Sequence, residues 1–370
     1  MALVSSLWAA VALVARASFR TDCHRIWSSP EKRRLPDKPQ WRAVKILIVK
    51  LSSLGDVVHS MPAVQDIRRA LPDAQVHWVV EQSFVPLVQR CDGVQDVIGC
   101  ELRRWRKSPL GVHTRSAWGK FSDALRGQAY DAVIDLQGLT KSALVARAAR
   151  LTPQGKRYAL ANRTEGSGWE APTRWVADVA IEIAPRVHAV TRSRELCAQA
   201  LQYAMPGELR FGLRADHPEP AAASASPCVA FVHGTSRDDK CWPEGHWVEL
   251  GRRLIADGFG IGLPHGDDTE LARARRIAQA LGAQAQVWER LDLGRLVDRM
   301  AGCAGAIGVD SGLSHIAVAL DLPHVQIYNF DTAWRTGPIE RARQLAVYAR
   351  PTPSVDAVWQ SWRDVMRPGR

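Results

Sequence analysis

The stretch KILIVKLSSLGDVVHSMPAV, residues 45–64, places one carboxylate, Asp56, directly after Gly55. The apolar run 46–49 predicts a buried strand, and the polar turn after it predicts the end of that strand. Ligands bind at the carboxyl ends of strands in open α/β sheets, and a lone carboxylate there can act as a general base. The same carboxylate could instead stabilise the first turn of a helix. The stretch alone leaves both interpretations open.

Two stretches in the second part of the chain also follow predicted strands. In HGTSRDDKCWP, residues 233–243, the hydroxyls of Thr235 and Ser236 and the ammonium of Lys240 could bind a diphosphate. The alternative for this stretch is a polar loop that ends in a packing corner. In LPHGDDTE, residues 263–270, acidic residues begin a helix, where they stabilise its N-terminus. An acid at this place can also bind ribose hydroxyls.

A third stretch, GVDSGLSHIAVAL at 308–320, joins a predicted strand to a helix through Asp310, Ser311 and Gly312. The free N–H groups at a helix start bind anions, and a glycine lets a phosphate approach closely. Asp310 would repel a phosphate, so we expect it to accept hydrogen bonds from a sugar. His315 follows near the same helix end. The alternative is a helix cap beside a hydrogen-bonded histidine.

Together these stretches predict one nucleotide-sugar site, which Asp56 would face from the first part of the chain. A base there could deprotonate a hydroxyl as the hydroxyl attacks the sugar, which inverts the anomeric centre by analogy with inverting glycosidases. Lys240 and helix N-termini could stabilise the leaving diphosphate without a metal. The chain contains no GxxxxGK[ST], GxSxG or DxD pattern, and no GxGxxG after its first strand. We therefore expect neither a metal nor another cofactor.

Strands and helices alternate from residue 44 onward, which predicts βαβ units and parallel sheets. In the first part we expect strands at 46–49, 76–80, 94–99 and 130–138, helices at 63–70, 116–127, 140–151 and 191–205, and a less regular stretch at 153–190. In the second part we expect strands at 228–234, 260–266, 285–289, 305–310 and 324–330, and helices at 244–258, 269–282, 293–303, 311–321 and 355–366. The predicted fold class is α/β, with two Rossmann-like βαβ domains that face a central cleft.

The predicted division of the chain has five parts. Residues 1–43 are expected to be a disordered extension, or the product of a start assigned too far upstream. Their apolar run is too short for a confident membrane span, and a weak membrane-surface anchor is the alternative. The remaining parts are an N-terminal acceptor-binding domain at 44–205, a linker rich in Pro, Ala and Ser at 206–227, a C-terminal donor-binding domain at 228–350, and a final helix at 351–370.

The 370 residues carry a formal net charge of +11, which favours acidic partners such as nucleic acid, anionic lipid or phosphorylated substrates. The basic residues are concentrated at 101–120, where six Lys or Arg accompany one Glu; the alternative reading is a solvated basic loop. The seven cysteines form no CxxC pair, which argues against a disulfide framework and a structural zinc site. A reducing, cytoplasmic setting fits this pattern.

The motifs ILIVKLSSLGDVVHSMPA, RRWRK, YDAVIDLQGLTKSAL, HAVTRSREL, TSRDDKCWP, LPHG and VDSGLSH occur in this order. Over roughly residues 44–330 the chain resembles the lipopolysaccharide heptosyltransferases of glycosyltransferase family 9, above all those that add the first heptose. The resemblance implies a GT-B fold and ADP-L-glycero-D-manno-heptose as the donor substrate, with no cofactor. It also implies the first Kdo residue of Kdo2-lipid A as the acceptor. The protein would then lie peripherally on the cytoplasmic face of the inner membrane, in contact with anionic lipid.

The resemblance also implies roles for individual residues. Asp56 is the general base. Donor binding falls on Thr235, Ser236 and Lys240 for the diphosphate, Glu270 for the ribose, Leu291 for the adenine, and Asp310, Ser311, Gly312 and His315 for the heptose and phosphates. Acceptor binding falls on Lys50, Arg103, Arg104, Arg106 and Lys107.

Some positions depart from the family pattern. Ser236 and Ser311 stand where threonine is common, and Leu291 replaces a methionine, a tolerable exchange. Gly234 and His265 also differ from the expected residues. The stretches 158–175 and 328–338 match poorly, and the extension at 1–43 has no counterpart. We therefore predict no acceptor-binding residue within 158–175.

Three alternatives remain at this point. The nearest is the sister enzyme that adds the second heptose, with the same donor and base; the acidic acceptor that RRWRK suits favours the first enzyme. A GT-B NDP-sugar epimerase would usually need more acids in the cleft. A nucleic-acid-binding module would need aromatics interleaved with a basic stripe, and the basic residues outside 101–120 are scattered, so we expect no nucleic-acid partner.

Overall fold

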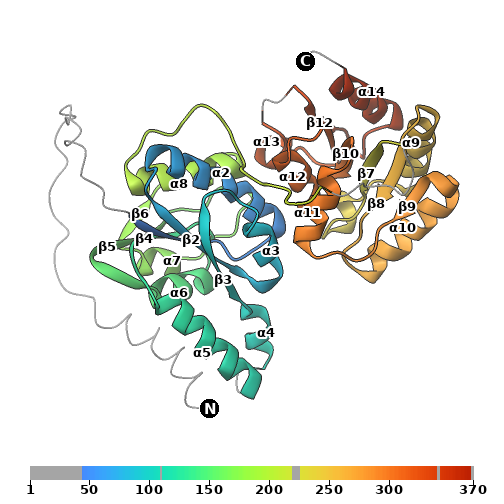
Figure 1. Ribbon diagram of the computed structural model, residues 1–370. Helices are drawn as coiled ribbons and strands as arrows, with labels where there is room; N and C mark the ends of the chain where they lie inside the picture. Colours follow the sequence, from blue (N-terminus) through green and yellow to red (C-terminus); the bar gives the residue numbers. More distant parts are fainter. Residues whose placement is uncertain (1–43, 109–110, 219–225, 340–341, 368–370) are drawn as a thin grey trace.

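The computed structural model describes residues 44–108, 111–218, 226–339 and 342–367 (Figure 1). They form two α/β halves, which we call the N-terminal half (44–218) and the C-terminal half (226–367). The extension predicted at 1–43 and residues 219–225 of the predicted linker lie outside the described residues. Within the part of the chain that is described, no helix is long and apolar enough to cross a membrane.

Six parallel strands form the sheet of the N-terminal half, in the order β3-β2-β1-β4-β5-β6. They are β1 (Lys45–Val49), β2 (Gln75–Glu81), β3 (Val94–Cys100), β4 (Ala129–Asp135), β5 (Arg150–Leu160) and β6 (Val179–Ile181). The helices are α2 (Leu54–Ala70), η1 (Gln82–Phe84), α3 (Val85–Val88), α4 (Leu102–Lys107), α5 (Val112–Arg126), α6 (Thr140–Ala148), α7 (Pro172–Val176) and α8 (Ala189–Leu201). Helices cover both faces of the sheet, which is why the central strand β1 is an almost unbroken run of buried apolar residues.

The C-terminal half has a second parallel sheet, in the order β12-β11-β10-β7-β8-β9. Its strands are β7 (Cys228–Val232), β8 (Gly260–Leu263), β9 (Ala285–Val287), β10 (Gly305–Val309), β11 (His324–Tyr328) and β12 (Gln344–Tyr348). Its helices are η2 (Asp238–Lys240), α9 (Glu244–Ala256), α10 (Asp268–Leu281), η3 (Gly282–Gln284), α11 (Leu293–Ala301), α12 (Gly312–Ala319), α13 (Ala333–Thr336) and α14 (Val355–Met366). The predicted α/β fold of two Rossmann-like halves is confirmed.

The two sheets share one strand order, in which the first and fourth strands of each half lie side by side. Successive connections leave to opposite sides at such a point, so a crevice opens beyond the carboxyl ends of those two strands. The crevices lie between β1 and β4 in the N-terminal half and between β7 and β10 in the C-terminal half. The strand order thus defines one ligand-binding edge in each half.

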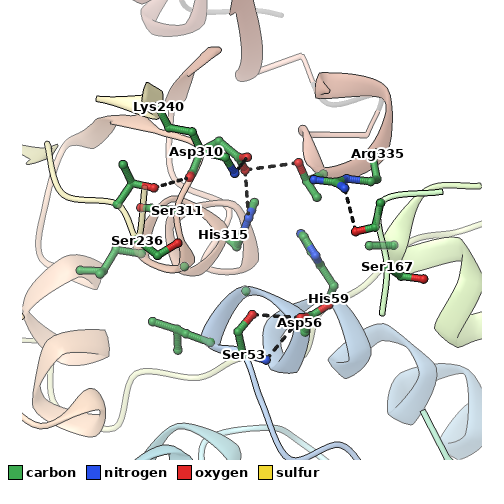
Figure 2. Close-up of a pocket in the computed structure, with 18 of the residues that line it drawn as sticks. Ser53, Asp56, His59, Ser167, Ser236, Lys240, Asp310, Ser311, His315 and Arg335 are labelled. Carbon is green, nitrogen blue, oxygen red and sulfur yellow. Dashed lines mark hydrogen bonds and ion pairs between the residues drawn. The ribbon is translucent and has the colours of Figure 1, made fainter. Parts of the chain in front are cut away.

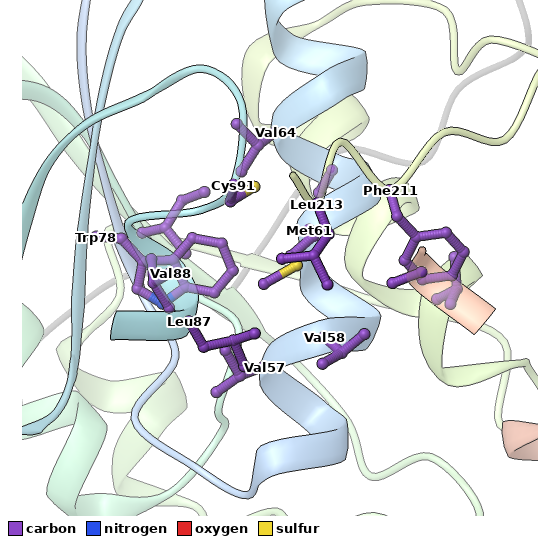
Figure 3. Packing of buried hydrophobic residues seen from close by; sticks show 14 of the residues in the cluster. Val57, Val58, Met61, Val64, Trp78, Leu87, Val88, Cys91, Phe211 and Leu213 are labelled. Carbon is purple, nitrogen blue, oxygen red and sulfur yellow. The ribbon is translucent and has the colours of Figure 1, made fainter. Parts of the chain in front are cut away.

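Helix α2 connects the cores of the two halves. Its Val57, Met61 and Val64 belong to one buried apolar cluster with Trp78 of β2 and Leu87 of α3 (Figure 3). The same cluster continues into α12 of the C-terminal half, against which α2 packs directly. Burying each such side chain stabilises the fold by roughly 1.5–3 kcal/mol. The halves are therefore held together by a shared core as well as by the chain that connects them.

The described part of the predicted linker packs on the N-terminal half. Phe211 and Leu213 are buried, and Leu213 forms an antiparallel bridge with Cys91 (Figure 3). The amide of Asp92 donates to the carbonyl of Gly212 at 2.8 Å. The described part of the predicted linker is thus anchored to the N-terminal half through residues 211–213.

The structure corrects several predicted elements. Helix α2 begins at Leu54, well before the predicted start at 63, because Pro62 lies inside it and obscures the helical pattern. Helix α6 ends at Ala148, so the last residues predicted as helix begin β5 instead. The stretch predicted as irregular, 153–190, contains most of β5 and all of α7 and β6.

The strands that the sequence did not predict lack a continuous apolar run. Strand β5 is half exposed, contains Pro153 and Gly155, and shows no continuous apolar run. Strand β12, which was not predicted, is an edge strand with alternating burial. The RRWRK segment, for which a solvated basic loop was the alternative reading, is the short helix α4, anchored by the buried Trp105.

Candidate active site

A cavity of about 520 Å³ lies between the two halves, at the crevices that the strand orders define (Figure 2). The N-terminal half contributes residues after β1, after β4 and near the start of α8; the C-terminal half contributes residues after β7, after β8 and after β10. This volume is within the usual range for small-ligand sites, roughly 300–1,000 Å³.

Asp56 occupies the third position of α2 and faces this cavity. Its Oδ2 accepts hydrogen bonds from the backbone N–H of Ser53, at 3.3 Å, and from the Ser53 hydroxyl, at 2.9 Å (Figure 2). Its Oδ1 lies 3.6 Å from Nζ of Lys50 and 3.7 Å from Nη2 of Arg192. The carboxylate therefore caps its helix with one oxygen and keeps the other between two cations.

Electrostatics keep Asp56 ionised at neutral pH. Burial in the recess raises the pKa of this carboxyl, but the charges of Lys50 and Arg192 outweigh burial and hold the pKa below its ordinary value. Its side chain is still 37% exposed, while those of Lys50 and Arg192 are 2% and 9% exposed. A ligand can therefore reach the carboxylate, whereas the cations stay fixed behind it.

Asp310 is the corresponding carboxylate of the C-terminal half. Its Oδ2 accepts a hydrogen bond from Nζ of Lys240 at 2.6 Å, and its Oδ1 lies 3.6 Å from Nε2 of His315 (Figure 2). The hydroxyl of Thr235 donates to its backbone carbonyl at 3.2 Å. Burial raises the pKa of Asp310, but His315 and Lys240 outweigh it, so the net shift is downward. The loops after β7 and β10 together present hydroxyls, one ammonium and the N-terminus of α12 to the cavity.

Glu270 reaches the same cavity from α10. Its backbone N–H donates to the side chain of Asp267 at 2.8 Å, while its own carboxylate accepts the N–H of Gly266 at 2.6 Å. A Cβ on Gly234 would lie only 2.1 Å from Oε1 of Glu270, so a side chain there would displace this carboxylate from its present position. Glu270 is therefore held against the loop that follows β7, beside Thr235 and Ser236.

The structure brings together most of the residues that the sequence predicted. Ten of them line the one cavity: Lys50, Asp56, Thr235, Ser236, Lys240, Glu270, Asp310, Ser311, Gly312 and His315. They come from the ends of β1, β7, β8 and β10, which lie at the predicted edges of the two sheets.

Five predicted residues do not line this cavity. Leu291 packs against the shared core as a partly buried side chain. Arg103, Arg104, Arg106 and Lys107 lie on α4, and all four are exposed. Arg104 lines a separate recess of about 240 Å³, together with His113 and Lys120. The predicted roles of these five residues stay predictions.

Sequence reasoning missed several residues of the cavity. Arg192 stands in the motif HAVTRSREL, which we used only for the resemblance, and a buried arginine has no signature of its own in a helical pattern. Arg335 comes from the stretch 328–338, where the family pattern fails. Gln137, after β4, accepts the N–H groups of Leu51 and Ser52 at 3.1 and 3.0 Å and so shapes the loop before α2.

This arrangement suits the transfer of a group between two ligands. The ionised carboxylate of Asp56 faces the cavity from the N-terminal half. The hydroxyls and the ammonium after β7, together with the N-terminus of α12, face it from the C-terminal half and could bind an anion. An ionised carboxylate can accept a proton from a hydroxyl, and an ammonium with helix N-terminal N–H groups can stabilise a departing phosphate. Within the described residues, no group of three or more His, Cys, Asp or Glu side chains is placed to hold a metal ion.

Comparisons with known proteins point to one family. The model of "Glycosyltransferase family 9 (heptosyltransferase)" matches residues 118–358. The chain is 37% identical over 301 residues to the Pseudomonas aeruginosa protein named lipopolysaccharide heptosyltransferase 1, which covers 81% of this chain and 82% of that protein. Proteins named heptosyltransferase 2 are less similar; that of Escherichia coli K12 is 27% identical over 312 residues, or 80% of this chain and 86% of that protein.

Solved structures agree with the sequence matches. The structure titled E. coli heptosyltransferase WaaC with ADP has a TM-score of 0.77 and 32% identity, and the match covers 87% of this chain and 100% of that one. A second structure of WaaC, with ADP-2-deoxy-2-fluoro heptose, has a TM-score of 0.72 and 33% identity over 86% of this chain and 98% of that one. Both likenesses extend over the two halves and therefore over the cavity between them.

Proposed function

The chain belongs to glycosyltransferase family 9, and from this premise we propose that it transfers L-glycero-D-manno-heptose from ADP-heptose to the first Kdo residue of Kdo2-lipid A. The observation that carries the proposal is the cavity that places Asp56 opposite the ion pair of Asp310 and Lys240, which follow β10 and β7. We assign the donor to the domain predicted at 228–350 and the acceptor to that predicted at 44–205.

The donor fits the chemistry of the C-terminal half. Thr235, Ser236 and Lys240 would bind the diphosphate, as would the N-terminus of α12 at Gly312. Glu270, fixed by Gly266, would accept hydrogen bonds from the ribose hydroxyls. In the present structure Lys240 is paired with Asp310, so the bound diphosphate would share this ammonium. The WaaC structures that contain ADP and an ADP-heptose analogue support this donor.

Asp56 acts as the general base in this proposal. The acceptor hydroxyl would give its proton to the free side of the carboxylate as the hydroxyl oxygen attacks the anomeric carbon. The bond to ADP breaks at the same centre, so the configuration inverts. Lys240 and the α12 N-terminus would stabilise the departing ADP, and we expect no metal to be needed.

The acceptor is the more anionic of the two substrates, because it carries carboxylates and phosphates. Lys50 lies beside the base, and Arg103, Arg104, Arg106 and Lys107 form an exposed basic helix at the end of β3, on the carboxyl edge of the same sheet. We propose that α4 binds the anionic part of the acceptor and contacts anionic lipid, which places the protein peripherally on the cytoplasmic face of the inner membrane.

A transfer assay read by mass spectrometry tests this function. The full chain is incubated with ADP-heptose and Kdo2-lipid A, with and without EDTA. The proposal predicts the mass of one added heptose and no effect of EDTA. Transfer only to an acceptor that already carries the first heptose would instead assign the sister activity, and an EDTA-sensitive reaction would overturn the metal-independent mechanism.

A further inference from the structure

Arg192, on α8, joins two parts of the site. Its side chain is nearly buried, and its Nη2 lies 3.7 Å from Oδ1 of Asp56. Its Nη1 donates a hydrogen bond to the hydroxyl of Thr164 at 3.0 Å. One end of the guanidinium therefore faces the carboxylate, while the other is held by a buried residue of the turn at 164–168.

The turn itself is closed on its own hydroxyls. The hydroxyls of Thr164 and Ser167 lie 2.8 Å apart, and the N–H of Ser167 donates to the carbonyl of Thr164 at 3.1 Å. Thr164 is 1% exposed. The position of the Thr164 hydroxyl therefore depends on the conformation of the whole turn.

Arg335 of the C-terminal half holds this turn from across the cavity. Its Nη1 donates to the carbonyl of Gly166 at 2.8 Å (Figure 2). Gly166 has φ +67°, and a Cβ there would lie 1.6 Å from Nη1 of Arg335. Only glycine admits both this backbone conformation and this guanidinium. The turn is thus shaped around a side chain from the other half of the molecule.

We propose that Arg192 is a positioning residue for the Asp56 carboxylate, and that Arg335 holds the turn on which Arg192 depends. The proposal deepens the proposed function and rests on Asp56 as its base. Its consequence is that the base reaches its working electrostatic state only when the two halves are brought together by the Arg335–Gly166 contact.

The charges around Asp56 define what the test must separate. Lys50 from the end of β1, Arg192 from α8 and His315 from α12 face the carboxylate, and Ser53 donates two hydrogen bonds to it. Removing a cation would raise the pKa of Asp56 directly. Variants that alter the turn without changing any charge are therefore the sharper probes: Thr164→Val removes the hydroxyl, and Gly166→Ala disrupts the seat of Arg335.

The readout is the titration of Asp56, followed by carboxyl ¹³C NMR of aspartate-labelled protein and assigned with Asp56→Asn. Arg192→Gln should raise this pKa by at least about one unit, because a nearby opposite charge lowers a carboxyl pKa by one or more. Thr164→Val and Gly166→Ala should shift it in the same direction by less. Thr164→Ser keeps the hydroxyl and should titrate like the wild type. Arg163→Gln removes an exposed charge immediately before this turn and should not move the titration.

The acidic limb of kcat/KM for heptose transfer should move with the NMR titration in every variant. An unchanged titration in Arg192→Gln would overturn the positioning role. A shift in Arg192→Gln but none in Gly166→Ala would overturn the part assigned to Arg335. Thermal unfolding of each variant identifies any that do not fold, and the other of the two turn variants, Thr164→Val or Gly166→Ala, then carries the comparison. Because the NMR titration needs no acceptor, it decides this inference even if the wild type transfers no heptose.

Discussion

At the scale of single residues, Asp56 is placed for both of the roles between which its sequence context could not choose. One oxygen accepts both donors of Ser53 and so stabilises the start of α2, while the other faces the cavity between Lys50 and Arg192. The cap fixes the orientation of the carboxylate, and the cations keep it ionised. A helix cap is therefore compatible with a base at this position.

Lys240 permits a direct test of the donor loop. Lys240→Met removes the one ammonium of the loop after β7, and charge-assisted hydrogen bonds contribute about 1.5–3 kcal/mol. We expect the affinity for ADP to fall by roughly 10- to 100-fold, measured by titration calorimetry. Lys156→Met, an exposed position on β5, is the control. Unchanged ADP affinity in Lys240→Met would remove this lysine from the donor site.

The residues that the sequence could predict are those that follow a recognisable strand end. Thr235, Asp310 and Asp56 each lie in or just after the connection that follows an apolar run, and the rule that ligands bind at strand ends made them candidates. Arg192 lies on α8 and Arg335 on the short helix α13, and only the folded chain brings them to the cavity. Their role depends on contacts between residues that are far apart in the sequence, such as Arg192 with Thr164, 28 positions apart, and Arg335 with Gly166, 169 positions apart.

At the scale of elements, α2 and α12 point their N-termini into the cavity and meet there through glycines. A Cβ on Gly55 would lie 2.6 Å from Cδ2 of His315, and one on Gly312 would lie 2.6 Å from the side chain of Leu54. The ring of His315 is buried and packs against that of His59, with centroids 4.1 Å apart. The close approach of these helices therefore depends on the absence of a side chain.

Gly55→Ala tests this packing. Overpacking a buried contact costs typically about 1–3 kcal/mol, and displacement of His315 should also weaken donor binding. We expect a lower urea midpoint and a higher KM for ADP-heptose. Gly119→Ala in α5 is the matched control, since a Cβ there meets no atom within 4 Å, and it should stabilise the protein by about 0.5–1 kcal/mol. Equal stability of the two variants would contradict a tight α2–α12 contact.

Elements with a strong apolar pattern were predictable, and those defined by their neighbours were not. Strand β1 and helix α14 follow directly from their sequences, because burial of every residue or of one face leaves a regular pattern. Strands β5 and β12 form because a neighbouring strand offers backbone hydrogen bonds, although their own sequences are mixed. Tertiary pairing outweighs local preference at these positions.

At the scale of the whole molecule, Asp298 on α11 ties three segments together. Its carboxylate accepts two hydrogen bonds from Arg90 of the N-terminal half, each 2.8 Å long. It also accepts the backbone N–H groups of Asp216 and His217, at 2.9 and 3.1 Å. The two halves and the segment that connects them therefore converge on one nearly buried carboxylate.

Asp298→Ala should lower the free energy of unfolding by about 2–3 kcal/mol, because Arg90 and two backbone donors lose their acceptor. Burial raises the pKa of Asp298, but Arg90 outweighs it, so the folded pKa lies below the unfolded value of about 3.9. The carboxylate therefore stabilises the fold above that pH, and its contribution is lost as the pH falls through the folded pKa.

Urea unfolding of the wild type and of Asp298→Ala at pH 7 and near pH 3 measures both parts of this prediction. The difference between the two proteins should be largest at pH 7 and should shrink in acid. Asp123→Ala, an exposed aspartate on α5, provides the control for loss of a surface carboxylate. A difference that stays constant with pH would show that the ion pair does not hold the halves together.

The central claim is that Asp56 is the base of heptose transfer, and a single-turnover measurement tests it most directly. Enzyme in excess is mixed with ADP-heptose and Kdo2-lipid A, and product is followed by rapid quench for the wild type, Asp56→Asn and Ser53→Ala. We predict that Asp56→Asn slows the chemical step by about 10²- to 10⁴-fold with ADP affinity unchanged. Ser53→Ala, which removes one capping contact, should retain most of the rate. A chemical step in Asp56→Asn as fast as in the wild type would reduce Asp56 to a helix cap and contradict the mechanism.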